Sequence, residues 1–138
     1  MKGIHGYLIF NGNCREAMQF YQKCLGGDLN LMPFSEAPME VSKAQKDLII
    51  HARLSKGDAV LMASDAEAGK PVRVGDNFWV SVHCDTIPEI ERLYGAFSQG
   101  GKVTMPLGET FWAVRFAMLT DKFGINWMFN LEKGKEKA

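Results

Sequence analysis

Alternating apolar and polar positions predict matching pairs of strands in the two halves of the chain. The run "IIHARLSKGDAVLMAS" holds two alternating stretches joined by Ser-Lys-Gly-Asp, and "VRFAMLTDKFGINWMFN" holds two joined by Thr-Asp-Lys-Phe-Gly. Alternation with a period of two residues, interrupted by a turn that contains glycine, is typical of a β-hairpin. We therefore expect one hairpin around Gly57 and another around Gly124.

A strand and a helix are predicted ahead of the first hairpin. The apolar run Tyr7–Phe10 ends at Asn-Gly-Asn, and a helical stretch then continues to Gly26-Gly27. Asn13 and Glu16 have the spacing of a capping box, so the Asn13 side chain is expected to accept a backbone N–H. Glycine tolerates the left-handed conformation that ends many helices. The pattern predicts a helix near residues 14–25.

The same start and stop signals recur later in the chain. Thr86 and Glu89 repeat the capping-box spacing at an offset of 73 residues, since 86 − 13 and 89 − 16 both equal 73. Pro88 suits the first turn of a helix because its missing N–H is not needed there. We expect a second helix over residues 87–98, so that strand–helix–three strands occurs twice.

This repeat predicts the fold class. Each half is too small to build a good core alone. We therefore expect an α+β fold of two tandem βαβββ modules within one domain, residues 1–138. Half 1 covers about residues 1–66 and half 2 about residues 76–132. With one helix on one face of each sheet, the other faces are expected to form a cupped sheet around a cleft, a common ligand site.

Composition narrows the classes of partner. The net charge is +0, with 16 Lys and Arg against 16 Asp and Glu, so no basic excess indicates nucleic-acid binding. No apolar run approaches the ~20 residues that span a bilayer, and the N-terminal stretch lacks the layout of a signal peptide. We expect a cytoplasmic protein with no nucleic-acid or membrane partner. Cys14 falls at a helix start, where the dipole can lower a thiol pKa, so a catalytic role is weighed against a structural one.

Three runs carry a family resemblance. "FNGNCREAMQFYQKCLGG", "KVTMPLGETFW" and "RFAMLTDKFGINWMFN" resemble the PhnB-like branch of the vicinal oxygen chelate superfamily. That superfamily includes glyoxalase I, extradiol dioxygenases and bleomycin-resistance proteins. The resemblance covers nearly the whole chain, and it implies the cupped fold and a homodimer. Some members of the branch are described as demethylubiquinone methyltransferases, but this chain has no Gly-x-Gly after a strand to hold a nucleotide cofactor.

The resemblance also implies where a metal ion would bind. Metal-using members place one His or Glu on the first strand and one on the last strand of each half. At those positions this chain has His5, Met62, Phe78 or Trp79, and Met128. A neutral, soft thioether does not replace a carboxylate for Zn²⁺, Ni²⁺ or Fe²⁺. We expect no metal and no cofactor, unless His51 or His83 supplies the missing ligands.

Strand alternation selects the candidate ligand-contacting residues. If His5 faces the cleft, Tyr7 and Ile9 do too, while Leu8 and Phe10 pack on the helix. The candidates are His5, Tyr7, Met62, Trp112, Arg115 and Met128. Phe111 stays an alternative to Trp112.

Arg115 is the least settled candidate. Strict alternation forbids Trp112 and Arg115 from sharing a face unless a bulge intervenes. The arginine either pairs with an acid, Glu109 or Asp121, or contacts an anionic ligand, because an unpaired buried charge is costly.

Two classes of function remain. We favour a binding protein that sequesters or senses a small, partly apolar molecule in an aromatic and Met-lined cleft. The alternative is a lyase or isomerase, either metal-independent with His5 and Tyr7 as acid and base or with a rearranged metal site. A third possibility is a fold that serves mainly in assembly. Whether the chain is an enzyme, and which ligand it takes, stays open.

Overall fold

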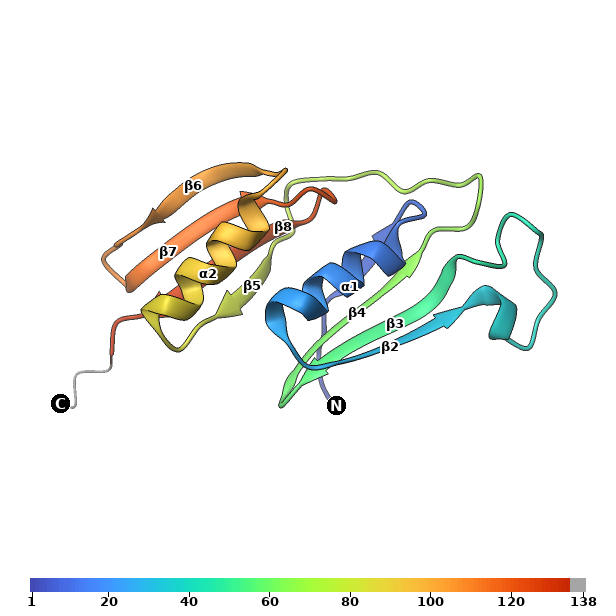
Figure 1. Cartoon of the computed structure of the whole chain (residues 1–138), viewed down its shortest axis with the longest axis horizontal. Helices are drawn as coiled ribbons and strands as arrows, with labels where there is room; N and C mark the ends of the chain where they lie inside the picture. Colours follow the sequence, from blue (N-terminus) through green and yellow to red (C-terminus); the bar gives the residue numbers. More distant parts are fainter. Residues whose placement is uncertain (135–138) are drawn as a thin grey trace. The chain divides into compact units, whose positions relative to one another are not determined.

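The chain divides into two compact units, each built as strand–helix–three strands (Figure 1). The computed structural model describes residues 1–134. Unit 1 is Met1–Arg73 and unit 2 begins at Val74. Each unit holds one four-stranded sheet and one long helix, which confirms the α+β fold of tandem βαβββ modules.

Unit 1 contains four strands, one α-helix and a short 3₁₀-helix. In chain order they are β1 (Tyr7–Phe10), α1 (Cys14–Leu25), β2 (Asp28–Pro33), η1 (Phe34–Glu36), β3 (Ile49–Lys56) and β4 (Ala59–Asp65). The strand order in the sheet is β1-β4-β3-β2. Strands β3 and β4 form the predicted hairpin, and β1 adds to β4 in parallel.

Unit 2 repeats this topology. Its elements are β5 (Val80–His83), α2 (Ile87–Ser98), β6 (Lys102–Gly108), β7 (Ala113–Thr120) and β8 (Asn126–Glu132). The strand order is β5-β8-β7-β6, with β5 parallel to β8 and the β7–β8 hairpin antiparallel. Both helices have the predicted bounds.

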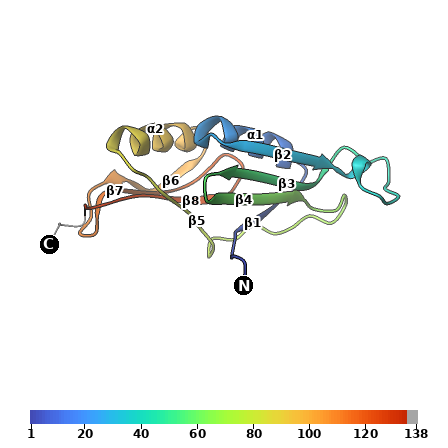
Figure 2. The same ribbon diagram turned by 90° about the horizontal axis from the view of Figure 1, so that it is seen from below.

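In each unit the helix covers one face of its own sheet (Figure 2). We call the opposite face, which carries no helix among the described residues, the open face of that unit. In unit 1, Leu8 and Phe10 are buried while Tyr7 and Ile9 are exposed, so the predicted alternation of β1 is confirmed. In unit 2, the Phe97 ring of α2 lies 4.8 Å from the Trp127 ring and 5.1 Å from the Phe129 ring.

The start of α1 differs from the prediction. Asn13 occupies the N-cap position, but its side chain makes no capping hydrogen bond. Asp65, at the end of β4, takes that role instead. Its Oδ1 accepts from the backbone N–H of Gly12 at 3.0 Å and of Cys14 at 2.9 Å. Its Oδ2 accepts from the N–H of Ile49 at 2.8 Å. An ionised carboxylate is a stronger acceptor than an amide oxygen, so it displaces the local cap.

The start of α2 follows the prediction. Thr86 Oγ1 accepts from the backbone N–H of Glu89 at 3.2 Å. The Glu89 carboxylate reaches back to the N–H of Asp85 at 2.8 Å. Pro88 lies in the first turn. All these contacts lie within four residues, so α2 carries its own cap.

A glycine after each helix is required by close packing. A Cβ on Gly27 would overlap the carbonyl oxygen of Ser55, and one on Gly101 would overlap that of Thr120. Gly27 is two residues beyond the end of α1 and Gly101 is three residues beyond the end of α2, so the repeat extends to these close backbone contacts.

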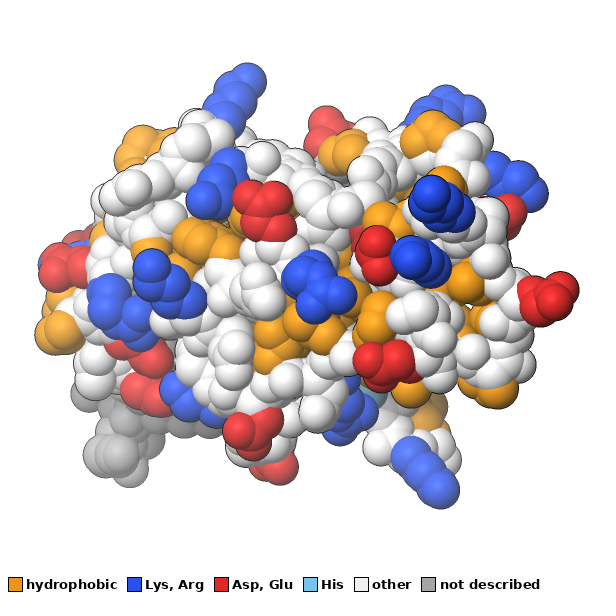
Figure 3. All heavy atoms as spheres, turned by 45° about the vertical axis from the view of Figure 1, so that its right-hand side comes forward, with side chains coloured by type: hydrophobic (Ala, Val, Ile, Leu, Met, Phe, Trp, Pro, Cys, Tyr) orange, Lys and Arg blue, Asp and Glu red, His pale blue; other side chains and the backbone are white. Residues whose placement is uncertain are grey.

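The surface carries charges of both signs. Figure 3 shows Lys and Arg side chains interspersed with Asp and Glu on the face in view, as the net charge of +0 suggests. No helix within residues 1–134 is long and apolar enough to cross a membrane.

Candidate functional site

A row of side chains crosses all four strands on the open face of unit 1. Asn30 of β2 lies opposite Arg53 of β3, Arg53 opposite Met62 of β4, and Met62 opposite Tyr7 of β1. Residues that are direct partners in neighbouring strands point to the same side of a sheet. The structure therefore brings the predicted Tyr7 and Met62 together, and it adds Arg53 and Asn30, which the sequence did not single out.

The adjacent row contains a histidine that contacts Tyr7. His51 lies opposite Met32, and Ile9 lies opposite Ser64. The Tyr7 hydroxyl is 3.2 Å from His51 Nδ1, and the two rings are 5.8 Å apart. The signal in the sequence was the spacing of His51 and Arg53, since residues i and i+2 of a strand share a face.

His5 lies outside this arrangement of strands. Strand β1 begins at Tyr7, so His5 precedes it by two residues and is exposed. Its Nε2 lies close to Gly3, where an added Cβ would be 2.9 Å away. The expectation that His5 lies on the first strand is therefore wrong, because the hydrogen-bonded pairing with β4 does not extend that far.

The open face of unit 2 holds a chain of polar contacts that ends at a tryptophan. Trp112 Nε1 donates to Asn130 Oδ1 at 3.2 Å. Asn130 Nδ2 is 3.5 Å from His83 Nδ1, and His83 Nε2 is 3.5 Å from Ser81 Oγ. The Phe116 ring lies 5.1 Å from that of Trp112. These contacts fix the indole ring of Trp112, a residue that is still 42% exposed.

Met128 lies on the same open face. It is the partner of Ser81 on β5 and of Met118 on β7. Its neighbours Trp127 and Phe129 point the other way and are buried against α2. The predicted orientation of this strand is therefore confirmed.

Arg115 points away from the open face, contrary to its expected place among the ligand-contacting residues. The pairing of β7 with β8 is irregular between Ala113 and Arg115, so the bulge that the sequence allowed is present. Beyond it, Arg115 shares the face of Ala117 and Leu119, whose partners pack on α2. Arg115 Nη1 donates to the Val114 carbonyl at 2.8 Å.

The two acids expected to pair with Arg115 bind other groups. Glu109 forms an ion pair with Lys133 at 3.3 Å. Asp121 Oδ2 accepts from the Trp127 indole at 2.8 Å, and its Oδ1 accepts from the backbone N–H of Phe123 and Ile125. These acids hold the β7–β8 region together.

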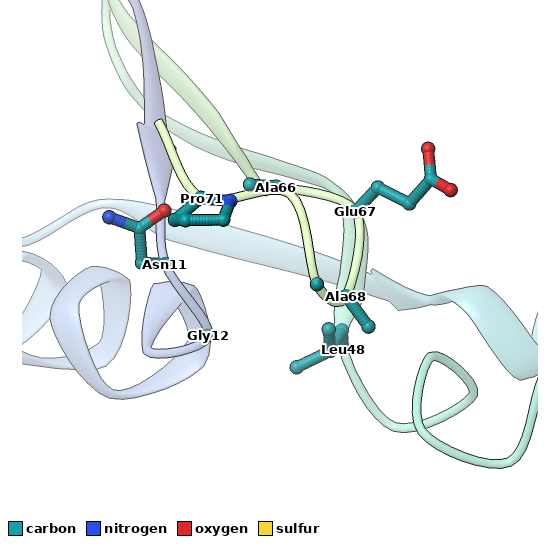
Figure 4. A pocket seen from close by; sticks show the side chains of 8 residues that line it. Asn11, Gly12, Leu48, Ala66, Glu67, Ala68 and Pro71 are labelled. Carbon is teal, nitrogen blue, oxygen red and sulfur yellow. The ribbon is translucent and has the colours of Figure 1, made fainter. Parts of the chain in front are cut away.

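Unit 1 also has a pocket of about 140 Å³ away from its open-face rows (Figure 4). It is lined by Asn11, Gly12, Leu48, Ala66, Glu67, Ala68, Gly69 and Pro71. Asn11 donates to the Val72 carbonyl at 3.1 Å and accepts from the Val72 N–H at 2.8 Å. Figure 4 shows the Glu67 carboxylate pointing away from the pocket. The polar groups here anchor the segment after β4.

Comparison of the amino-acid sequence with known protein families identifies the superfamily of this chain. The model of the Glyoxalase/Bleomycin resistance protein/Dioxygenase superfamily matches residues 3–129. The chain belongs to this superfamily. It is similar to Protein YjdN of Escherichia coli (strain K12), with 33% identity over 139 residues, 92% of this chain and 93% of that protein.

Two solved structures are similar to nearly the whole chain. Protein PA1353 from Pseudomonas aeruginosa is 45% identical, with a TM-score of 0.85 over 94% of this chain and 98% of that one. The PhnB protein from Bacillus cereus is 26% identical, with a TM-score of 0.75 over 94% of this chain and 99% of that one. The predicted resemblance to PhnB-like members of the superfamily is confirmed.

The residues at the superfamily's metal positions do not fit a hard divalent ion. Met62 and Met128 present thioethers on the two open faces, where metal-using members have His or Glu. The two histidines that could replace them contact other groups, His51 the Tyr7 hydroxyl and His83 the Asn130 amide. Among residues 1–134, no three His, Cys, Asp or Glu side chains are grouped so that they could hold a metal ion.

Two buried cysteines, Cys14 and Cys84, are poor nucleophiles. Burial, reinforced by the Asp65 carboxylate, raises the pKa of Cys14 to about 12. Burial and the nearby Glu89 raise the pKa of Cys84 to about 12. The thiolate is the reactive form of cysteine, so these values favour the structural interpretation of Cys14 over the catalytic one.

Proposed function

We propose that this protein binds a small, partly apolar organic molecule on the open faces of its sheets, without help from a metal ion. Trp112 carries the proposal. The residue is 42% exposed, yet its indole N–H donates to Asn130 and its ring orientation is set by edge-to-face contact with Phe116. An aromatic side chain that is fixed before the ligand arrives loses little entropy on binding.

Methionines supply the apolar part of each unit's open face. Met62 lies on the open face of unit 1, and Met118 and Met128 are partners on that of unit 2. Thioether side chains are flexible and polarizable, so they adapt to ligands of differing shape. Such a lining suits sequestration or sensing of a molecule with an aromatic or aliphatic body.

Indole N–H signals in a ¹⁵N–¹H NMR titration test this proposal directly. The chain has three tryptophans, and we expect benzamide or another neutral aromatic amide to shift the Trp112 signal. Trp127 is buried and Trp79 donates to the Asp76 carbonyl at 2.8 Å, so both serve as internal controls. If all three signals move together, or if none moves at millimolar probe, the Trp112 surface is not a binding site.

One observation favours the alternative of a metal-independent lyase or isomerase. The 3.2 Å contact between Tyr7 and His51 gives the tyrosine a base as its neighbour, a partner that His5 does not supply. Such a pair could move a proton next to a carbonyl group. Exchange of carbon-bound hydrogen in hydroxyacetone for deuterium, abolished by His51→Gln, would establish this chemistry. Exchange that is equal in the variant would exclude a role for the pair.

We also propose that the protein forms a homodimer. Tyr7 and Ile9 are 43% and 47% exposed on β1, which is an edge strand of its sheet. An exposed edge strand with apolar side chains is a template for pairing with another chain. Sedimentation velocity at micromolar concentration is expected to show twice the chain mass of 15.4 kDa, and a monomer throughout would contradict the proposal.

A further inference from the structure

We infer that the open face of unit 1 binds the oxyanion of its ligand, a carboxylate or phosphonate group, through Arg53, His51 and Asn30. The inference rests on the proposed function and adds the chemical class of the ligand. The three residues lie in neighbouring positions of β2 and β3, and each can present N–H donors away from the helix.

Arg53 provides the charge. It lies on β3, an inner strand of the sheet, with neutral Asn30 on one side and neutral Met62 on the other. Its side chain is exposed, and no ion pair in the described part of the chain involves it. A guanidinium offers five N–H groups in a fixed fork that matches carboxylate and phosphonate oxygens. Charge-assisted bonds of this kind are about twice as strong as neutral ones.

His51 provides a second donor in a defined direction. The Tyr7 hydroxyl occupies His51 Nδ1 at 3.2 Å. When the hydroxyl donates to Nδ1, the neutral imidazole carries its proton on Nε2, which is then free to donate to a ligand. His51 and Arg53 are two residues apart on one strand, so their Cα atoms are about 7 Å apart. Side chains of this length can converge on the oxygens of one group.

The remaining side chains of this face agree with an anion that carries an apolar body. The carboxylate of Asp28 lies at the start of edge strand β2, opposite Ser55 and two residues before Asn30. It lies diagonally across from Arg53, a separation of about 7–8 Å in an antiparallel pair, and it forms no ion pair with Arg53 in the described part of the chain. Met32 lies opposite His51 in the same row and is 44% exposed. Its thioether offers apolar contact to the rest of the ligand.

Three matched probes test the inference. Benzoate, phenylphosphonate and neutral benzamide share a phenyl ring and differ in the charged group. We expect the dissociation constant of at least one of the two anions to be about 10-fold, or more, below that of benzamide. Arg53→Gln is expected to remove that preference and leave benzamide binding unchanged, because it removes the cation and keeps an exposed polar side chain. Arg15→Gln, an exposed position on α1, is the matched control and is expected to change none of the three.

The outcomes separate this inference from the proposed function. Tighter binding of benzoate alone assigns a carboxylate ligand, and tighter binding of phenylphosphonate alone assigns a phosphonate. Both results support the inference. If benzamide shifts the Trp112 signal but the anions bind no better and Arg53→Gln has no effect, the inference is wrong and the proposed function stands. If no probe shifts any open-face signal, both fall. Thermal melts of each variant confirm that the fold is intact.

Discussion

Replacing Asp65 should destabilise unit 1 far more than replacing the residue at the N-cap of its helix. In Asp65→Ala, three backbone N–H groups lose their acceptor, those of Gly12, Cys14 and Ile49. Asn13→Ala removes a side chain that makes no capping hydrogen bond. The two variants therefore compare a long-range cap with the local cap that the sequence suggests.

The magnitude follows from the bonds that are lost. A hydrogen bond to a charged group contributes about 1.5–3 kcal/mol, and a buried donor left unpaired adds a further penalty. Cys14 and Ile49 are fully buried, whereas Gly12 is exposed and can bond to water. Loss of the hydrogen bonds from Cys14 and Ile49 is therefore expected to lower the free energy of unfolding by about 4 kcal/mol in Asp65→Ala. Asn13→Ala is expected to change the free energy of unfolding by at most about 0.5 kcal/mol.

Urea unfolding followed by circular dichroism measures both variants, and amide hydrogen exchange locates the effect. Protection is expected to fall first at the Cys14 and Ile49 amides. Asp65→Asn should lower the free energy of unfolding by an intermediate amount, about 2 kcal/mol. The remaining amide oxygen can still accept from the start of α1, but the new N–H₂ group is a donor and cannot accept from the Ile49 N–H. If Asn13→Ala costs as much as Asp65→Ala, or if Asp65→Ala costs less than about 1 kcal/mol, the assigned cap is wrong.

Three further predictions concern the thiols, two glycines and metal content. Cys14 and Cys84, whose pKa values are raised to about 12, should resist Ellman's reagent at pH 8 in the native protein and react after unfolding. Because the unfolded chain ionises these thiols first, stability should fall as the pH rises from about 9 towards 12, and a flat profile would contradict this. Gly101→Ala should lower the free energy of unfolding, measured by urea denaturation, by about 2 kcal/mol, because the added Cβ would overlap the Thr120 carbonyl oxygen. Gly95→Ala, which places its Cβ in open space on α2, should raise that free energy by roughly 0.5–1 kcal/mol. Equal effects of the two substitutions would refute the overlap at Gly101. After dialysis, elemental analysis should find no stoichiometric Zn²⁺, Ni²⁺ or Fe²⁺ and EDTA should leave the melting temperature unchanged, whereas one tightly bound ion per chain would move the protein to the metalloenzymes.

Local patterns predicted most of the fold. Alternation placed Leu8 on the helix side of β1 and Tyr7 on the open side, as the structure has them. The Thr86 and Glu89 capping box is present because all its partners are close in sequence. Signals that act within a few residues can be read from the chain itself.

Long-range contacts could not be predicted in this way. Asp65 replaces the Asn13 cap from the end of β4, 51 residues further along the chain, and no sequence pattern around residue 13 indicates this contact. The bulge before Arg115 decides which face that side chain takes, and alternation alone leaves this undetermined. The contact of Tyr7 with His51 joins two strands that are not neighbours in the sheet, so it depends on the strand order.

The two helix starts also differ in when they can form during folding. The cap of α2 needs only residues 85–89, so it can form while the rest of unit 2 is still a coil. The cap of α1 joins Cys14 to a residue 51 positions away, and closing such a loop costs entropy that only the assembled sheet repays. In pulsed hydrogen exchange, the first amides of α2 would gain protection early. The first amides of α1 would gain protection only after β4 pairs with β1 and brings Asp65 to the helix start. Two modules with one topology would then fold with different kinetics, the second by local closure and the first by long-range closure.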